Sequence, residues 1–204
     1  MRSGPSTEER IRREAAALFR RKGFNGTSMA ELAAEVGITK SSLYHHFRSK
    51  QALLSEIIEL TVNRVTPLVQ EVAESDLPIA ERLSMAVAIH TEEAIRDQDA
   101  VACFIEEGRY LTPDFMAAHV ANRDRYQEIF QGMLEEGIAS GDFVSQNPGL
   151  SVRAIMGMCN SVVRWYRPGG EHTPEEIARE FARFAVGGAS VGLRRVASTL
   201  GTER

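Results

Sequence analysis

Two short helices joined by a tight turn dominate what the first fifty residues of this chain can fold into. Ser28 and Glu31 have the spacing of a capping box, and Gly37 stands where a left-handed C-cap residue is needed, so we expect a short helix between them. Thr39 is a good N-cap for the next helix, which turns Leu43 inward at helical spacing. The pattern predicts a compact helix-turn-helix.

A longer helix precedes this pair. Ser6 and Glu9 form another capping box, and Gly23 and Gly26 are expected to end the helix and turn the chain. One face of this helix is apolar, and the opposite face is cationic: Arg10, Arg13, Arg20, Arg21 and Lys22. This cationic face is suited to contact with a polyanion such as DNA. The alternative is that these side chains are ordinary solvated surface charges.

The charge of the chain is unevenly distributed. Residues 1–52 hold ten Lys and Arg against five Glu, a net charge of +5, whereas the whole chain has a net charge of −4 and the remainder therefore −9. A basic head on an acidic body is typical of a protein that meets phosphate through its head alone. An architectural DNA-binding protein that senses no ligand would have a basic body, so the −9 argues against that class.

The outward face of the second short helix has small or polar side chains and no carboxylate: Lys40, Ser41, Ser42, Tyr44, His45 and His46. Such a face can lie along a polyanion while its side chains reach base edges in the major groove. Ser49 is expected to cap the following helix, which places Lys50 in its first turn, where a cation opposes the helix dipole. Local stability does not explain a cation there, so we expect Lys50 to meet a DNA phosphate; an indifferent surface lysine is the alternative.

Residues 27–50, including Leu-Tyr-His-His-Phe and the following Ser-Lys, closely resemble the DNA-binding domain of the TetR family of bacterial transcriptional regulators. The resemblance extends from about residue 11 to residue 58. It implies a homodimer that binds double-stranded DNA at a palindromic operator, with half-sites about one helical turn apart. It implies DNA contacts at Thr27, Ser28, Thr39, Lys40, Ser41, Tyr44, His45 and Lys50, to which the outward position of Ser42 adds one more.

The rest of the chain is predicted to be helical, because it contains no alternating strand pattern and no hairpin signal. We expect an all-α protein in which residues 1–52 form a three-helix DNA-binding domain and residues 53–204 form an effector-binding and dimerisation domain. After the helix that leads out of the head, helices are predicted at residues 78–96, 100–111, 112–139, 150–166 and 174–197. Asn147 and Pro148 are expected to lie in a loop.

The last two predicted helices are expected to form the dimer surface. The helix at 150–166 is apolar almost all the way round, which requires burial on more than one side. The last helix offers the apolar side chain of Phe184, followed by Gly187 and Gly188. The two glycines permit another helix to approach closely. A core helix with a glycine-weakened end is the alternative.

Methionine and aromatic residues crowd the middle helices and favour an adaptable apolar pocket for a hydrophobic small-molecule effector, although each one singly is more often a core residue. Glu107 and Arg109 are among the polar candidates to orient the ligand. The predicted ligand-binding residues are Phe104, Tyr110, Tyr126, Phe130, Met133, Met156, Asn160 and Trp165.

Residues 164–170, Arg-Trp-Tyr-Arg-Pro-Gly-Gly, resemble the sensor domains of TetR-family repressors of fatty-acid and sterol degradation. Several members of that group are relieved by acyl-CoA thioesters, so the resemblance favours an acyl-CoA effector. The alternative is a drug-responsive regulator of an efflux gene.

An enzyme, for example one that processes an acyl thioester, is the competing class. The five histidines lack zinc-ligand spacing, and the sequence contains no Gly-x-Ser-x-Gly elbow, Walker loop or dinucleotide fingerprint. Cys103 with Glu106 is the one nucleophile-like pair, and a carboxylate beside a thiol raises the pKa of that thiol. We therefore expect no catalytic residue, no metal site and no cofactor.

The first residues lack the apolar core of a signal peptide, and no apolar run approaches membrane-spanning length. We expect a cytoplasmic protein with no membrane partner. Cys103 and Cys159 are predicted to be buried thiols and not a disulfide.

Overall fold

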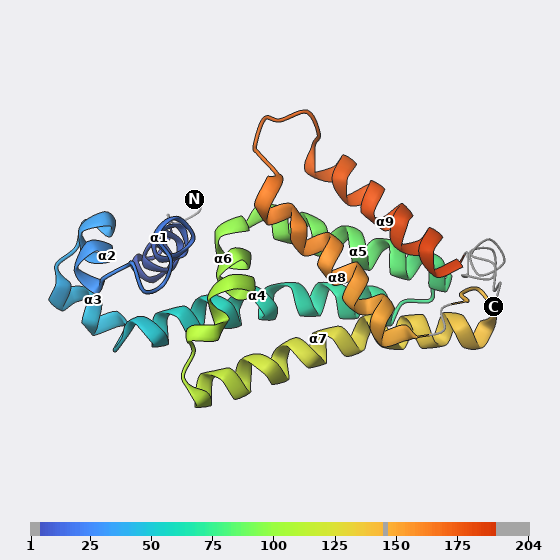
Figure 1. The fold of residues 1–204 in the computed structure, drawn as a ribbon, viewed down its shortest axis with the longest axis horizontal. Coiled ribbons are helices and arrows are strands. Elements are labelled where there is room, and N and C mark those ends of the chain that lie inside the picture. Colours follow the sequence, from blue (N-terminus) through green and yellow to red (C-terminus); the bar gives the residue numbers. More distant parts are fainter. Residues whose placement is uncertain (1–4, 145–146, 191–204) are drawn as a thin grey trace, which may run out of the picture. The chain divides into compact units, whose positions relative to one another are not determined.

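The computed structural model describes residues 5–144 and 147–190, and this part of the chain is helical (Figure 1). The predicted all-α class is confirmed. The head is formed by α1 (Thr7–Lys22), α2 (Met29–Val36) and α3 (Lys40–His46), followed by α4 (Lys50–Ala73). The remaining elements are α5 (Ile79–Arg96), α6 (Gln98–Ala102), the π-helix η1 (Cys103–Glu107), the 3₁₀-helix η2 (Gly108–Tyr110), α7 (Pro113–Ser140), α8 (Pro148–Trp165) and α9 (Pro174–Ser190).

The predicted caps of the two short helices are confirmed. Ser28 Oγ accepts the N–H of Glu31 at 3.2 Å, and a Glu31 carboxylate oxygen accepts the N–H of Ser28 at 3.0 Å. Gly37 ends α2 in the left-handed conformation with φ 75° and ψ 34°, a region that L side chains rarely occupy. Thr39 Oγ1 then accepts the N–H of Ser42 at 3.1 Å. Short-range capping chemistry therefore sets both helix lengths.

Two predicted segments differ from the structure. Residues 100–111 do not form one regular helix, because the chain passes through α6, the wider turn of η1 and the tighter turn of η2. The contacts that Cys103 and Glu107 make with the head accompany this change, and helical periodicity cannot reveal them. Pro148 lies in α8 and not in a loop, since Asn147 Oδ1 caps the helix by accepting the N–H of Leu150 at 3.0 Å. Residues 191–197 of the predicted last helix lie outside the described residues.

The chain divides into two compact units. The first contains Met1–Arg64 and Asp97–Asp124, and the second contains Val65–Arg96 and Arg125–Arg204. The apolar core of the first unit joins α1, α2, α3 and the start of α4 to residues from far along the chain, namely Ala100, Cys103 and Leu111. The boundary predicted after residue 52 stays a prediction, and the compact units divide the chain elsewhere.

In the second unit, α5 packs against both α8 and α9. Leu83 and Val87 of α5, Phe130 of α7, and Cys159 and Val162 of α8 are fully buried. Cys103 and Cys159 are both buried free thiols, as predicted. Within the described ranges, no helix is long and apolar enough to span a membrane.

Candidate DNA interface and effector site

The recognition face predicted on α3 is exposed. Leu43 turns inward and is fully buried, whereas Lys40, Ser41, Tyr44 and His45 are exposed on the other side of the helix. The Lys40 ammonium lies 5.9 Å from the centroid of the Tyr44 ring. Ser28 and Thr39, at the N-terminal ends of α2 and α3, are also exposed, and Ser42 is half-buried.

The cationic face of α1 is paired within the protein. The Arg10 guanidinium donates to the carbonyl of Val36 at 2.8 Å, where it helps to cap the C-terminal end of α2. Ion pairs of 2.8–3.3 Å join Arg13 to Glu14, Arg20 to Asp99, Arg21 to Glu35 and Lys22 to Glu31. These contacts favour the structural interpretation of this face. Among the described residues of the head, Lys40 and Arg48 are exposed cations with no carboxylate partner, as is Arg10, which bonds the Val36 carbonyl instead.

Lys50 has a local structural role, contrary to the expectation that local stability cannot explain a cation in the first turn of this helix. Its Nζ donates to the carbonyls of Phe24 at 2.6 Å and Thr27 at 2.7 Å, and it lies 4.3 Å from the centroid of the Phe24 ring. The ammonium therefore closes the turn between α1 and α2, so local stability does explain a cation here. Burial lowers the pKa of Lys50. These contacts do not test the DNA contact that the family resemblance implies for Lys50.

Thr27 lies in the same turn and is buried. Its hydroxyl donates to the carbonyl of Gly23 at 3.0 Å, and its own carbonyl accepts from Lys50. The side chain of Thr27 is thus occupied within the turn, unlike the exposed side chains of α3.

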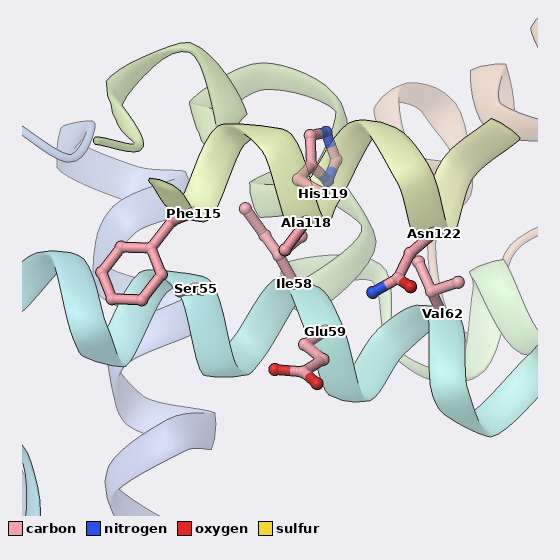
Figure 2. Close-up of a pocket in the computed structure, with 8 residues that line it drawn as sticks. All are labelled: Ser55, Ile58, Glu59, Val62, Phe115, Ala118, His119 and Asn122. Atoms are coloured by element: carbon pink, nitrogen blue, oxygen red, sulfur yellow. The ribbon is translucent and has the colours of Figure 1, made fainter. Parts of the chain in front are cut away.

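Two of the predicted ligand-binding residues, Phe104 and Tyr110, belong to the first unit and pack against its core. The Tyr110 ring stacks on the ring of Phe24 with centroids 5.6 Å apart, and the Phe104 ring meets His119 edge-on at 4.9 Å. A pocket between α4 and α7 lies in this unit (Figure 2), where residues of α4 and α7 line it from facing sides: Ser55, Ile58, Glu59, Val62, Phe115, Ala118, His119 and Asn122. Its volume of about 20 Å³ has room for about one water molecule.

The second unit brings three of the predicted ligand-binding residues together around a histidine. His90 of α5 lies with Nδ1 2.8 Å from the hydroxyl of Tyr126 and with Nε2 3.1 Å from Oδ1 of Asn160. The rings of Tyr126 and Phe130 lie 5.6 Å and 6.4 Å from the His90 ring. We call His90, Tyr126 and Asn160 the polar triad.

Burial governs the ionisation of the triad. It lowers the pKa of His90 to about 4, a shift that the hydrogen bond with Asn160 opposes in part. Burial also raises the pKa of Tyr126, with smaller contributions from Cys159 and Glu93. The triad is therefore neutral at pH 7, and it offers donors and acceptors in an apolar surrounding.

The other predicted ligand-binding residues are placed differently. Met133 and Met156 are buried in the second unit. Trp165 is 47% exposed at the end of α8, where its ring packs on Phe181 at 6.3 Å and its indole N–H donates to Ser161 Oγ at 3.2 Å.

Two residues were missed or assigned another role from the sequence. His90 is not among the predicted ligand-binding residues, yet it follows Leu83 and Val87 on the buried stripe of α5. A histidine in such a stripe is a usable signal for a buried polar contact. Glu107 was a candidate to orient a ligand, and its carboxylate instead accepts the N–H of Phe24 at 3.2 Å.

Cys103 is poorly suited to nucleophilic chemistry. Its thiol is fully buried and donates to the carbonyl of Ala16, with sulfur and oxygen 3.7 Å apart. Burial, and then the nearby carboxylates of Glu107 and Asp99, raise the pKa of this thiol, so it stays protonated. In the described ranges, no group of three or more His, Cys, Asp or Glu side chains could hold a metal ion.

The outer faces of α8 and α9 leave large apolar side chains uncovered. Leu150 is 61% exposed and Phe184 is 59% exposed. Gly157 on α8 and Gly187 and Gly188 on α9 are exposed as well. The opposite faces of both helices are buried within the second unit.

Residues 11–57 match the family model for bacterial regulatory proteins of the tetR family, and residues 76–189 match the model for the tetracyclin repressor-like C-terminal domain. The HTH-type transcriptional repressor KstR2 of Rhodococcus jostii is 29% identical over 176 residues, which cover 85% of this chain and 86% of the relative. KstR2 of Mycobacterium tuberculosis H37Rv is 28% identical over 180 residues, covering 85% and 88%.

Solved structures give the same assignment. PfmR of Thermus thermophilus, a TetR-family transcriptional regulator, is 31% identical with a TM-score of 0.81, covering 88% of this chain and 98% of PfmR. AibR in complex with isovaleryl coenzyme A and operator DNA is 24% identical with a TM-score of 0.78, covering 88% and 97%, and this likeness shows the fold alone. The chain therefore belongs to the TetR family, and it is a DNA-binding transcriptional repressor of the helix-turn-helix type and not an enzyme.

Proposed function

We propose that this repressor acts as a homodimer on a palindromic operator and leaves it when a hydrophobic small molecule binds to the second unit. The observation that carries the DNA-binding half of the proposal is the exposed face of α3. This face presents Lys40, Ser41, Tyr44 and His45 without a carboxylate. Side chains of this kind can reach base edges while Ser28 and Thr39 meet the phosphate backbone.

The uncovered faces of α8 and α9 support the homodimer. Exposed large apolar side chains on a polar surface mark interaction sites, and Leu150 and Phe184 are more than half exposed. The exposed glycines at 157, 187 and 188 allow two helices to approach closely. A two-fold dimer through these helices would present two copies of α3 to successive turns of one DNA face.

The polar triad supports the effector half of the proposal. Its hydrogen-bonding atoms lie beside the rings of Tyr126 and Phe130, and Met133 and Met156 are buried in the same unit. An apolar ligand that carries a carbonyl or hydroxyl group could replace one hydrogen bond of the triad with its own. Binding would then separate α5, α7 and α8 and change the spacing of the two α3 helices.

An acyl-CoA is the favoured effector class. The support is the resemblance of residues 164–170 to sensor domains of lipid-degradation repressors, together with the similarity to KstR2, a ketosteroid transcriptional regulator in Mycobacterium tuberculosis. A drug-like hydrophobe is the second candidate, because a pocket rich in methionine and aromatic side chains accommodates either class.

DNase I footprinting on the DNA upstream of the chain's own gene tests the DNA-binding proposal. We expect a protected palindrome whose half-sites are about one helical turn apart, and we expect the Ser41→Glu variant to lose this protection. Ala117→Glu, which adds the same negative charge at an exposed residue of α7, is a matched control and should protect the same bases. Protection that is identical for the wild type and Ser41→Glu would contradict the assignment of α3.

A further inference from the structure

The turn between α1 and α2 is held by two charged side chains that come from other helices. Oε2 of Glu107 accepts the N–H of Phe24 at 3.2 Å, and Nζ of Lys50 donates to the carbonyl of the same residue at 2.6 Å. The two side chains therefore hold both polar groups of the Phe24 backbone. Lys50 also donates to the carbonyl of Thr27 at 2.7 Å, at the residue before the N-cap of α2.

Aromatic contacts hold the side chain of Phe24 in the same place. Phe24 is 4% exposed, the Tyr110 ring is stacked on its ring with centroids 5.6 Å apart, and the Lys50 ammonium lies 4.3 Å from the centroid of its ring. Residues 107 and 110 belong to η1 and η2, more than eighty residues along the chain from this turn. All of these residues lie in the first compact unit.

This arrangement is costly for stability alone. Glu107 is 7% exposed, and a carboxylate out of water is stabilising only when its hydrogen bonds are good. An apolar side chain of similar size would pack against the turn without this penalty, but it would not accept the N–H of Phe24. A buried charge that holds one backbone group is better suited to fixing a conformation than to adding stability.

The segment that carries Glu107 is itself attached to the head. Asp99 of α6 pairs with Arg20 of α1 at 2.8 Å, and the Cys103 thiol donates to the carbonyl of Ala16. Between Cys103 and Glu107 the chain forms a π-helical turn, an irregular geometry that is frequent at functional positions in helices. A small change in this turn would move the carboxylate away from the N–H of Phe24.

We propose that Glu107 is a positioning residue for operator binding. Together with Lys50 it fixes the α1–α2 turn. The turn in turn fixes the start of α2, the helix against which α3 is braced. The residue touches no DNA. Through it, the π-helical segment controls the DNA affinity of the head. The proposal rests on the proposed function, because it concerns how the same DNA interface is held and regulated.

Variants of Glu107 separate positioning from packing. Glu107→Gln keeps an oxygen that can accept the N–H of Phe24, whereas Glu107→Leu removes the acceptor and keeps a side chain of similar size. Glu106→Leu makes the same change at the neighbouring carboxylate of the turn and is the matched control. Operator affinity is measured by fluorescence anisotropy at several salt concentrations, and folding is checked by circular dichroism.

We expect Glu107→Leu to weaken operator binding by about tenfold to a hundredfold, the loss of one hydrogen bond to a charged group. Glu107→Gln should stay within about threefold and Glu106→Leu within about twofold of the wild type. The dependence of log affinity on log salt should be unchanged in Glu107→Leu, because no phosphate contact is lost. A folded Glu107→Leu variant with wild-type affinity, or a Gln variant as weak as the Leu variant, would overturn the proposal.

Lys50→Met gives an independent test from the other side of the turn. A positioning lysine leaves the salt slope unchanged when it is replaced, whereas loss of a phosphate contact lowers the slope by about 1. We expect a weaker affinity with the wild-type slope. A slope that is lower by about 1 would show that Lys50 acts on DNA directly and would overturn its role in this proposal.

Hydrogen exchange keeps the proposal testable if Glu107→Leu does not fold. In the wild-type protein without DNA, the Phe24 amide should exchange much more slowly than the amide of exposed Asn25, as measured by NMR. Equally fast exchange of both amides would overturn the proposal. This result is independent of DNA, so it distinguishes a failure of the positioning role from a failure of the proposed operator.

Discussion

Acid should destabilise the protein through His90, because this side chain is held neutral. Burial lowers the pKa of His90 from its ordinary value of 6.5 to about 4. A base whose pKa is lower in the folded protein contributes stability that is fully present above the unfolded pKa and is lost as the pH falls toward the folded pKa. Between pH 7 and pH 5 this linkage amounts to about 2 kcal/mol of unfolding free energy.

Urea titrations of the wild type and of His90→Gln at pH 7, 6 and 5 measure this effect at one fixed protein concentration, since unfolding of a dimer depends on concentration. Glutamine can still hydrogen-bond but does not titrate, so the variant should lose about 2 kcal/mol less than the wild type between pH 7 and pH 5. His172→Gln, at an exposed histidine of the α8–α9 connection, is the control and should keep the wild-type dependence. The same pH dependence in the wild type and His90→Gln would refute a neutral His90 in the folded protein.

Three further predictions follow from single positions. Gly37→Ala should lower the free energy of unfolding by about 1 kcal/mol because φ at this residue is 75°, whereas Gly132→Ala, where nothing lies within 4 Å of an added Cβ, should raise it by about 0.5–1 kcal/mol. Urea titrations that give the same sign for both variants would contradict this. Phe184→Glu should dissociate the proposed dimer in sedimentation velocity, and an intact dimer would place the interface elsewhere. Lys40→Ala and His45→Ala should each reduce the preference for operator over scrambled DNA by about tenfold or more, and equal losses on both DNAs in anisotropy would show that neither residue contacts bases.

The head could be predicted in detail because its signals are local. A serine and a glutamate three residues apart define the start of α2, and one glycine defines its end. Capping depends on the chemistry of adjacent turns, which the sequence displays directly. For the same reason, the N-cap at Thr39 and the inward position of Leu43 were predicted correctly.

The contacts that join distant segments could not be predicted. The partners of His90 lie 36 and 70 residues away, and the partner of Glu107 lies 83 residues away. Nothing in a local pattern pairs such residues, because packing of whole helices brings them together. The structural role of Lys50 was missed for the same reason, because its carbonyl partners Phe24 and Thr27 lie 26 and 23 residues earlier, in the turn between α1 and α2.

Effector release of the bound operator is the measurement that tests the account most directly. Labelled operator DNA is saturated with the repressor at fixed salt, and acyl-CoAs of different chain and ring structure are added while fluorescence anisotropy is recorded. We expect one thioester to release the DNA and to lose at least about tenfold in potency against a folded His90→Leu variant, which lacks the hydrogen bonds of the triad. Tight operator binding that neither the acyl-CoAs nor a parallel set of drug-like hydrophobes reverses would contradict the claim of an effector-released repressor.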